Sequence, residues 1–465
     1  MRKTWAIARN LISESLRMKV AVGFLVLLTG ILVCLPLLMK GDGTLTGRVQ
    51  TFLSYSLWSL AFILGILTLF VSCGSLAGEV ENKHAFLTAT KPVTRGQMMI
   101  GKWLGVAVLD LVLLGIGGGM IFATVQYMRR LPGTHALDRF TLESEVLTCR
   151  HAVSLKPPKE EFDAAVQGYV ERLREERRPM SPEAEAEVRE QKRAELWRDF
   201  RTVEPLQVKS WLFEDLRIAR DPQRVVHLRY KLQLSRAPVL HPMRFYWVFG
   251  DRGKGATQYV RAVEDPEDQV RSAPIPCDAI GTDGSLLVSL VNRDPDEPPQ
   301  PWLSRISFEQ PDDLQVLYLI GTFGGNYLRA LALVYCRLLF LAALGLFAAS
   351  FLGFPVACMV AFTIYFAASL AGYIGESLEF ISPVQRIDDP FEYVAFTLRP
   401  LVAAFLWMLP RFGAYDPIGT LIDGRLVTLR WVLTAVVQLV LIRTTVIGLA
   451  AILIFGRREL AEVVV

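Results

Sequence analysis

The sequence predicts a polytopic α-helical membrane protein, with six transmembrane helices arranged 3+3 around a large extracytoplasmic α+β insert. Hydrophobic residues make up 52% of the 465 residues, and the mean hydropathy is +0.33, which is high for a soluble chain of this length. Six apolar runs reach the roughly 20 residues that a helix needs to cross a bilayer. A long polar block, residues 129–326, separates the first three runs from the last three.

The six predicted spans have similar length and composition. They are residues 20–39, 52–76, 103–127, 327–352, 355–375 and 431–455. A seventh apolar stretch, 394–409, is shorter and carries Arg399 and Pro400 near its middle. We therefore expect it to be a re-entrant or interfacial helix within the C-terminal half, residues 327–465.

Basic residues near the span ends predict the orientation. They gather in three places: before the first span, between the second and third, and in the C-terminal tail. Six spans put all three places on one side of the membrane, which the positive-inside rule makes the cytoplasm. We therefore expect an inner-membrane protein with cytoplasmic termini and an extracytoplasmic insert. The net charge of only +4 argues weakly against a nucleic-acid partner.

Residues 1–19 precede the first span and have the pattern of an amphipathic interfacial helix. Trp5, Ala8 and Leu11 are among the apolar residues near helical spacing, whereas Arg9 and Glu14 lie elsewhere. The length of this polar start argues against a cleavable signal peptide. A membrane-surface role and a gating or docking role both fit the pattern.

The insert contains two segments with different sequence patterns. Residues 156–200 alternate in charge, contain many helix formers and are interrupted near Pro179 and Pro182, which predicts a helical hairpin. Residues 206–320 contain short alternating runs separated by Pro, Gly, Asp and Asn, which predicts a β-sandwich or jelly roll. Cys149 and Cys277 lie in this polar block and are a candidate disulfide, the alternative being two thiols. Neither a metal-ligand motif nor a catalytic constellation stands out.

The stretch RGQMMIGKW (95–103) has the glycine and lysine spacing of a Walker A loop. Trp103, however, occupies the position of the hydroxyl residue that would hold magnesium. A P-loop also needs a preceding strand, and the element after this stretch is a membrane span. We therefore expect no nucleotide site in this chain.

The wider segment 76–106 can supply a helix that contacts a soluble partner. EVENKHAFLTAT places Val80, Phe86 and Leu87 near one face, and Pro92 would end the helix. A solvated loop with anchoring charges is the alternative.

This segment resembles the signature of ABC-2 type exporter permeases, in which a cytoplasmic stretch joins the second and third spans. The residues that fit its order are Glu79, Glu81, Lys83, Leu87, Pro92, Val93, Thr94, Arg95, Gly101 and Lys102. Residues 343–368 and 453–460 resemble the family's later connection and its C-terminal close. The resemblance implies a cytoplasmic coupling segment, 77–100, that contacts a separate ABC ATPase through Glu79, Glu81, Lys83, Phe86, Leu87, Pro92, Val93 and Arg95.

The same resemblance implies the rest of the functional hypothesis. The chain would be the permease subunit of an exporter, paired with a second permease copy in the lipid bilayer. It would hold no cofactor itself, because ATP and magnesium would be bound by the ATPase. The large insert departs from the minimal family plan. A membrane-anchored extracytoplasmic binding or assembly module is therefore the alternative function.

Three ionisable residues fall inside predicted spans: Asp110, Arg337 and Arg443. Charges at this depth are costly, so they usually pair or line a path. We expect Asp110 to pair with one of the arginines, as a path element or as a structural bridge. In the same span as Asp110, the glycines between 115 and 119 predict close helix approach or a bend.

Overall fold

The computed structural model divides into two compact units. The membrane unit contains residues 1–148 and 322–465, and the insert unit contains Cys149–Gly321. The structure describes residues 2–17, 19–38, 44–81, 94–130, 136–176, 182–216, 219, 226–235, 243–265, 268–293, 304–380 and 412–457. The expected re-entrant helix 394–409 lies outside these residues.

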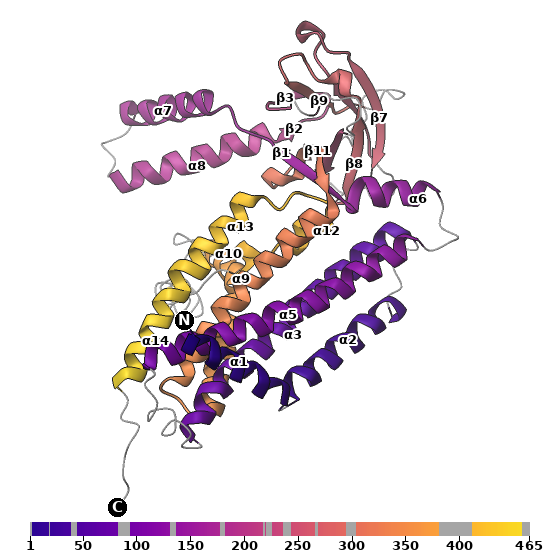
Figure 1. The fold of residues 1–465 in the computed structure, drawn as a ribbon. Helices are drawn as coiled ribbons and strands as arrows, with labels where there is room; N and C mark the ends of the chain where they lie inside the picture. Colours follow the sequence, from indigo (N-terminus) through magenta and orange to yellow (C-terminus); the bar gives the residue numbers. More distant parts are fainter. Residues whose placement is uncertain are drawn as a thin grey trace, which may run out of the picture. The chain divides into compact units, whose positions relative to one another are not determined.

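The membrane unit is built from long helices (Figure 1). Its N-terminal part contains α1 (Arg2–Arg17), α2 (Val20–Leu38), α3 (Leu45–Glu81), α5 (Arg95–Arg129), α6 (Ala136–Thr141) and the π-helix η1 (Leu142–Val146). Its C-terminal part contains α9 (Phe323–Ala349), α10 (Phe354–Phe380), η6 (Phe412–Tyr415), α12 (Ile418–Ile422), α13 (Leu429–Ala435), η7 (Val436–Thr444) and α14 (Thr445–Arg457).

Five helices in the described part of the chain are long and apolar enough to cross a membrane. They are α3, α5, α9, α10 and the continuous run α13–η7–α14, and they correspond to the last five predicted spans. The count becomes six if α1 and α2 are taken together, although they are bent by 61° relative to each other. The predicted class, a helical membrane protein, is confirmed.

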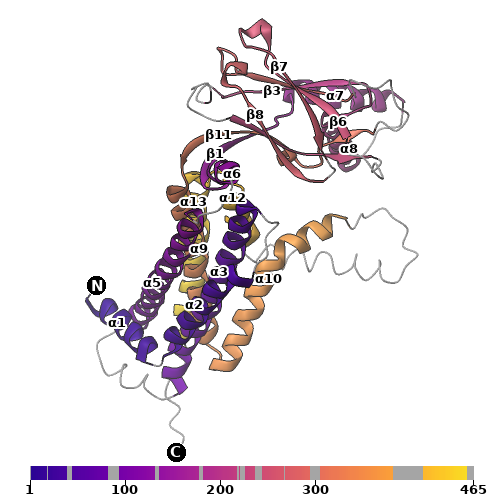
Figure 2. The same cartoon turned by 90° about the vertical axis from the view of Figure 1, so that its right-hand side faces the viewer.

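The middle of the membrane unit is formed by α3, α5 and α9, which pack on one another (Figures 1 and 2). Two of the predicted close approaches are present. A Cβ on Gly117 would lie 2.5 Å from Leu60 of α3, and one on Gly118 would lie 2.7 Å from Leu331 of α9. Small residues at such crossings let helix backbones approach. Gly115 and Gly119 instead face open space in the described structure.

The insert unit contains the predicted helical hairpin. Its helices are α7 (Lys159–Glu176) and α8 (Pro182–Phe200), with Pro182 at the first helical position as expected. Phe162 of α7 contacts Trp197 and Phe200 of α8 edge to face, which joins the two helices through aromatic packing.

The rest of the insert unit is β-rich. Its strands are β1 (Thr148–Ser154), β2 (Thr202–Val203), β3 (Val208–Phe213), β4 (Val226–Lys231), β5 (Gln233–Leu234), β6 (Met243–Phe249), β7 (Tyr259–Asp265), β8 (Val270–Ile275), β9 (Leu286–Val291), β10 (Ile306–Ser307) and β11 (Leu314–Thr322). They form three sheets ordered β1-β11-β4-β8, β2-β10-β5 and β3-β9-β6-β7. Ladders such as Tyr230 opposite Leu314 are antiparallel.

One hydrophobic core joins these sheets. Tyr230 of β4 contacts Phe245 and Trp247 of β6, so the two four-stranded sheets face each other across the core. This agrees with the predicted sandwich. The alternating runs predicted within 206–320 are present as strands, among them β4, β6, β9 and β11. The prediction missed β3 and β8, in which Lys209 and Arg271 lie within the strands, and also β1 and β2.

Candidate coupling site at the start of α5

The N-terminus of α5 is fixed by a capping box. The Thr94 hydroxyl accepts a hydrogen bond from the Gln97 backbone N–H at 3.2 Å, and the Gln97 side chain accepts one from the Thr94 N–H at 3.4 Å. Such caps satisfy backbone donors that a helix start leaves without partners. We call residues 94–103 the α5 start segment, because its side chains contact four other helices.

Arg95 fastens this segment to the end of α14. Its Nη1 donates to the carbonyl oxygens of Phe455 at 2.7 Å and Gly456 at 2.6 Å. The guanidinium carbon also lies 5.9 Å from the centre of the Phe455 ring. A cation is favourable at a helix C-terminus, where carbonyls lack helical partners. The start of α5 and the end of α14 are therefore on the same side of the membrane unit.

Glycines let α1 lie directly on α5. A Cβ on Gly101 would be 2.9 Å from Ile7 Cβ and 2.9 Å from the Thr4 carbonyl oxygen. A Cβ on Gly105 would be 3.0 Å from the Ala8 carbonyl oxygen. Both distances are below ordinary van der Waals contact, so only glycine fits without movement.

Protein contacts therefore hold one side of α1 in place. Ala8 and Leu11 are buried, whereas Trp5 and Leu16, on the same predicted apolar face, are about half exposed. A helix is thus present where the sequence predicts one, and its interfacial position stays a prediction.

Lys102 and Trp103 connect α5 to α3 and α9. Lys102 is only 2% exposed, and its Nζ donates to the Ser75 carbonyl oxygen at 2.6 Å. Trp103 donates from Nε1 to the Leu339 carbonyl oxygen at 3.0 Å. The sequence favours a Lys102 side chain that extends from the span entry toward the lipid headgroups, but in the structure its ammonium group finds a backbone acceptor inside the helix bundle instead.

The helical conformation of this stretch also decides whether its Walker-like glycine and lysine spacing forms a P-loop. Gly96, Gly101 and Lys102 all lie within one continuous helix that begins at Arg95. Gly101 and Lys102 lie beyond the first turn, where backbone N–H groups are used in the helix's own hydrogen bonds, so they cannot surround a phosphate as those of a P-loop do. As expected, the stretch does not form a P-loop.

Most of the predicted ATPase-contact residues precede this segment. Glu79 and Glu81 fall in the last turns of α3, which continues to Glu81, so they extend the second span. Lys83, Phe86, Leu87, Pro92 and Val93 lie outside the described residues. Only Arg95 has a described side chain, and it is directed to α14. The coupling role of this set stays a prediction.

Asp110 lies fully buried between α3 and α5. Both of its carboxyl oxygens lie within hydrogen-bond distance of the Thr68 hydroxyl, at 2.9 and 3.0 Å, and that hydroxyl also lies 2.7 Å from the Leu64 carbonyl oxygen. The Ser72 hydroxyl donates to the Thr68 carbonyl oxygen one turn along α3. A Cβ on Gly345 would lie 2.7 Å from Ser72 Oγ, so this polar cluster coincides with a close approach of α9 to α3.

The structure brings neither predicted arginine to Asp110. Arg337 Nη1 lies 3.9 Å from Asp416 Oδ1, and its guanidinium stacks over Phe412 at 5.1 Å. Arg443 lies in the π-helix η7, and its buried Nη1 has no hydrogen-bond partner among the described residues. The predicted Asp110–Arg pair is wrong for the described part of the chain, because a nearer hydroxyl satisfies the carboxylate.

Sequence reasoning missed Thr68 and Ser75, the partners of Asp110 and Lys102. Lys102 uses the backbone carbonyl of Ser75, which a residue of any type would supply, so the sequence carried no signal for it. The Thr68 hydroxyl can bond to a carbonyl of its own helix, so such residues occur in spans without any further partner. The only available signal was that each intramembrane charge needs a partner.

The candidate disulfide is not formed, although both cysteines are described. Cys149 lies in β1 and Cys277 begins the short η4 (Cys277–Ala279) directly after β8. Strands β1 and β8 are opposite edges of one sheet, with β11 and β4 between them. Three strand spacings are about 14 Å, and a bridge requires Cα atoms within about 7 Å. This arrangement argues against the bridge.

The fold and this site define a helical membrane protein. In it, the first turns of the span α5 contact the helices α1, α3, α9 and α14. Comparison with known families then identifies the class. Residues 5–148 match the family described as ABC-2 family transporter protein, so this N-terminal part of the chain is similar to ABC-2 membrane components. The match covers most of α1 and all of α2, α3, α5, α6 and η1. Searches of curated proteins and of solved structures found no match.

Proposed function

We propose that the chain is the permease subunit of an ABC exporter and is driven by a separate ABC ATPase. The observation that carries this proposal is the α5 start segment, which comes directly after the undescribed residues 82–93 and contacts α1, α3, α9 and α14. A displacement imposed on residues 77–93 would therefore reach four helices through short hydrogen bonds and backbone contact. The match of residues 5–148 to the ABC-2 family supports the same role.

In the proposed mechanism, ATP-driven closure of the ATPase moves the end of α3 and the start of α5. Lys102 is rigidly placed by its bond to Ser75, and Arg95 by its bonds to the end of α14. The helices would tilt as a group rather than singly, because packed interfaces have discrete arrangements. Export of an unidentified substrate past the spans would result.

The intramembrane residues have a narrower place in this proposal. Asp110 lies where α3, α5 and α9 approach closely, so a change in their packing would change its hydrogen bond to Thr68. We infer that Asp110 reports or limits this motion. Arg443 faces no described partner and lies in a π-helical stretch, a feature frequent at functional sites.

The proposed orientation has cytoplasmic termini, a cytoplasmic coupling segment and an extracytoplasmic insert. The Arg95 bonds support part of it, because they put the C-terminal end of α14 beside the start of α5. A second permease copy is proposed as well. The last span supports it weakly, since Leu433, Leu441 and Leu453 on it are more than half exposed and could face either lipid or a partner.

Crosslinking tests the proposal at the residues that carry it. A photoreactive amino acid at Phe86 or Leu87 should crosslink the ABC ATPase that co-purifies with the full chain. The same amino acid at Phe140, an exposed position in α6, is the control. Replacing Glu79 and Glu81 by glutamine should lower transport-stimulated ATP hydrolysis, whereas Glu14→Gln on α1 should not. An intact chain that recruits no ATPase, together with unchanged export in the double variant, would sink the proposal.

The insert unit supports a second candidate function, a membrane-anchored binding or assembly module. It is a separate compact unit with its own core, which is the observation that favours this alternative. Substrate or partner binding that survives loss of the ATPase contact would favour it over transport.

A further inference from the structure

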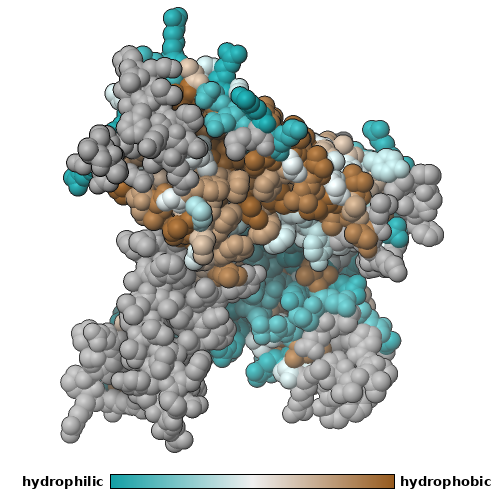
Figure 3. Space-filling model, turned by 90° about the horizontal axis from the view of Figure 1, so that it is seen from below, coloured by the Kyte–Doolittle hydropathy of each residue, from teal (hydrophilic) through white to brown (hydrophobic). Residues whose placement is uncertain are grey.

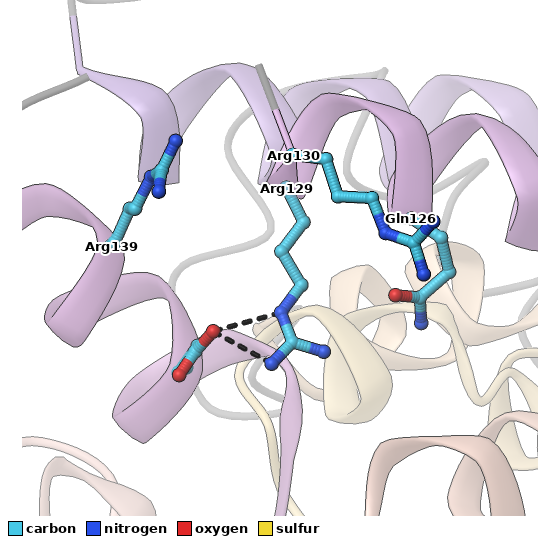
Figure 4. A pocket seen from close by; sticks show the side chains of 5 residues that line it. Gln126, Arg129, Arg130 and Arg139 are labelled. Carbon is cyan, nitrogen blue, oxygen red and sulfur yellow. Dashed lines mark hydrogen bonds and ion pairs between the residues drawn. The ribbon is translucent and has the colours of Figure 1, made fainter. Parts of the chain in front are cut away.

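A pocket of about 400 Å³ lies at the C-terminal end of α5. Gln126, Arg129 and Arg130 of α5 line it, together with Arg139 of α6 and Glu143 of η1 (Figure 4). Three guanidinium groups and one carboxylate leave an excess of positive charge around it. Arg side chains bind phosphate oxygens through paired N–H groups, so the pocket has the chemistry of a phosphate site.

Glu143 holds one of these arginines in place. Its Oε1 accepts from Arg129 Nε at 2.8 Å and from Nη2 at 2.7 Å. Arg129 and Glu143 are each about half exposed, so this ion pair contributes little by itself. It does fix the Arg129 guanidinium at the wall of the pocket, as the dashed lines in Figure 4 show.

The pocket is placed where a lipid headgroup would lie. The apolar part of α5 ends at Tyr127, which is 67% exposed, and Phe140 beside Arg139 is 61% exposed. Exposed aromatic rings beside arginines are typical of the membrane–water boundary. Apolar surface is also exposed in the view of Figure 3, with hydrophilic side chains at its margins.

An exposed stripe on α5 leads to the pocket. Val112, Ile116, Gly119, Ala123 and Tyr127 are all exposed and recur at helical spacing, and Arg130 continues the same face. Gly119 has open space where a side chain would be. Fifteen residues of helix span about 22 Å, enough to accompany an acyl chain across one leaflet of about 15 Å.

We propose that this pocket binds the phosphate headgroup of an anionic phospholipid whose acyl chain lies along the α5 stripe. The arginines also complement the negative end of the α5 dipole, and a purely structural role would need nothing more. The two accounts differ in what they predict for ligand binding. The proposal does not depend on the ATPase partner.

Binding of defined lipids to the purified full chain tests the proposal. Native mass spectrometry should show retained phosphatidylglycerol but not phosphatidylcholine of the same acyl composition. Arg130→Gln and Arg139→Gln should each weaken phosphatidylglycerol binding about fivefold, since each interfacial arginine contributes to attraction of anionic lipid. Arg252→Gln, at an exposed position of the insert unit, is the matched control and should leave binding unchanged.

A further variant should strengthen lipid binding rather than weaken it, and misfolding would not produce that result. Glu143→Gln removes the carboxylate that lines the pocket among the described residues but keeps an oxygen that can accept from Arg129, so phosphatidylglycerol should bind several-fold more tightly. Weaker or equal binding in Glu143→Gln would contradict the proposal. Equal retention of phosphatidylcholine would reduce the site to apolar surface. Binding of inorganic phosphate as tight as that of the lipid would make it a site for free anions.

Discussion

Gly101→Ala tests whether α1 is held to α5 by direct backbone contact. The added Cβ would lie 2.9 Å from both Ile7 Cβ and the Thr4 carbonyl oxygen. Because a backbone oxygen cannot turn aside like a flexible side chain, α1 would have to move as a whole. Overpacking of this kind costs about 1–3 kcal/mol.

Gly96→Ala, in the same helix, is the matched control. There the nearest atom to the new Cβ is Ile452 Cγ2 at 3.8 Å, an ordinary contact. Both changes add one methyl group and gain a similar helix propensity, about 1 kcal/mol. The difference between the two variants therefore isolates the contact with α1.

The assay measures how often α1 lifts from α5. Leu11 is 3% exposed, so a cysteine placed there reacts with a water-soluble maleimide only when α1 opens. The background chain would carry Cys34→Ser, because Cys34 is exposed. A cost of about 1–3 kcal/mol should raise the labelling rate of Gly101→Ala about 5- to 150-fold over Gly96→Ala. Equal rates in the two variants would refute the proposed backbone contact.

Three further predictions concern buried polar groups. Lys102→Met keeps the chain length but removes the charged bond to the Ser75 carbonyl, so it should destabilise the full chain by about 1.5–3 kcal/mol in a thermal assay. Asp110→Asn can still accept from Thr68, so it should retain most of the stability that Asp110→Leu loses; loss of transport in a stable Asp110→Asn chain would show that the charge itself is used. Burial lowers the pKa of His227 to about 4, with Arg150 and Arg261 adding to the shift. An unfolded His227 with pKa 6.5 takes up its proton first, so the insert should be most stable above pH 6.5 and lose about 3 kcal/mol as the pH falls to 4. Hydrogen exchange of insert peptides measures this loss, and a slope that persists in His227→Leu would contradict the assignment.

Local pattern was enough to predict much of the fold. Apolar length alone located α3, α5, α9 and α10, because a membrane span must satisfy its own backbone within one helix. Period-two alternation located β4, β6, β9 and β11. Strands β3 and β8 were missed because a charged residue on an exposed face does not prevent pairing, and pairing is decided by distant strands.

The candidate site shows where sequence patterns stop being informative. The stretch 94–103 was singled out for its glycine and lysine spacing, which suggested either a phosphate loop or a boundary of a span. The structure assigns its residues to contacts instead: Gly101 to α1, Lys102 to Ser75 and Arg95 to the end of α14. These partners are up to 361 residues away along the chain.

The sequence by itself determined that the chain spans a membrane, contains a β-rich insert and carries costly charges inside its spans. Each of these features is visible in composition and local periodicity. Only the tertiary structure decided which groups satisfy those charges. A buried Asp110 or Lys102 must find a partner, but a hydroxyl or a carbonyl serves as well as an opposite charge. Which one is nearest depends on how the helices cross, and the glycines that permit those crossings act only once two helices meet.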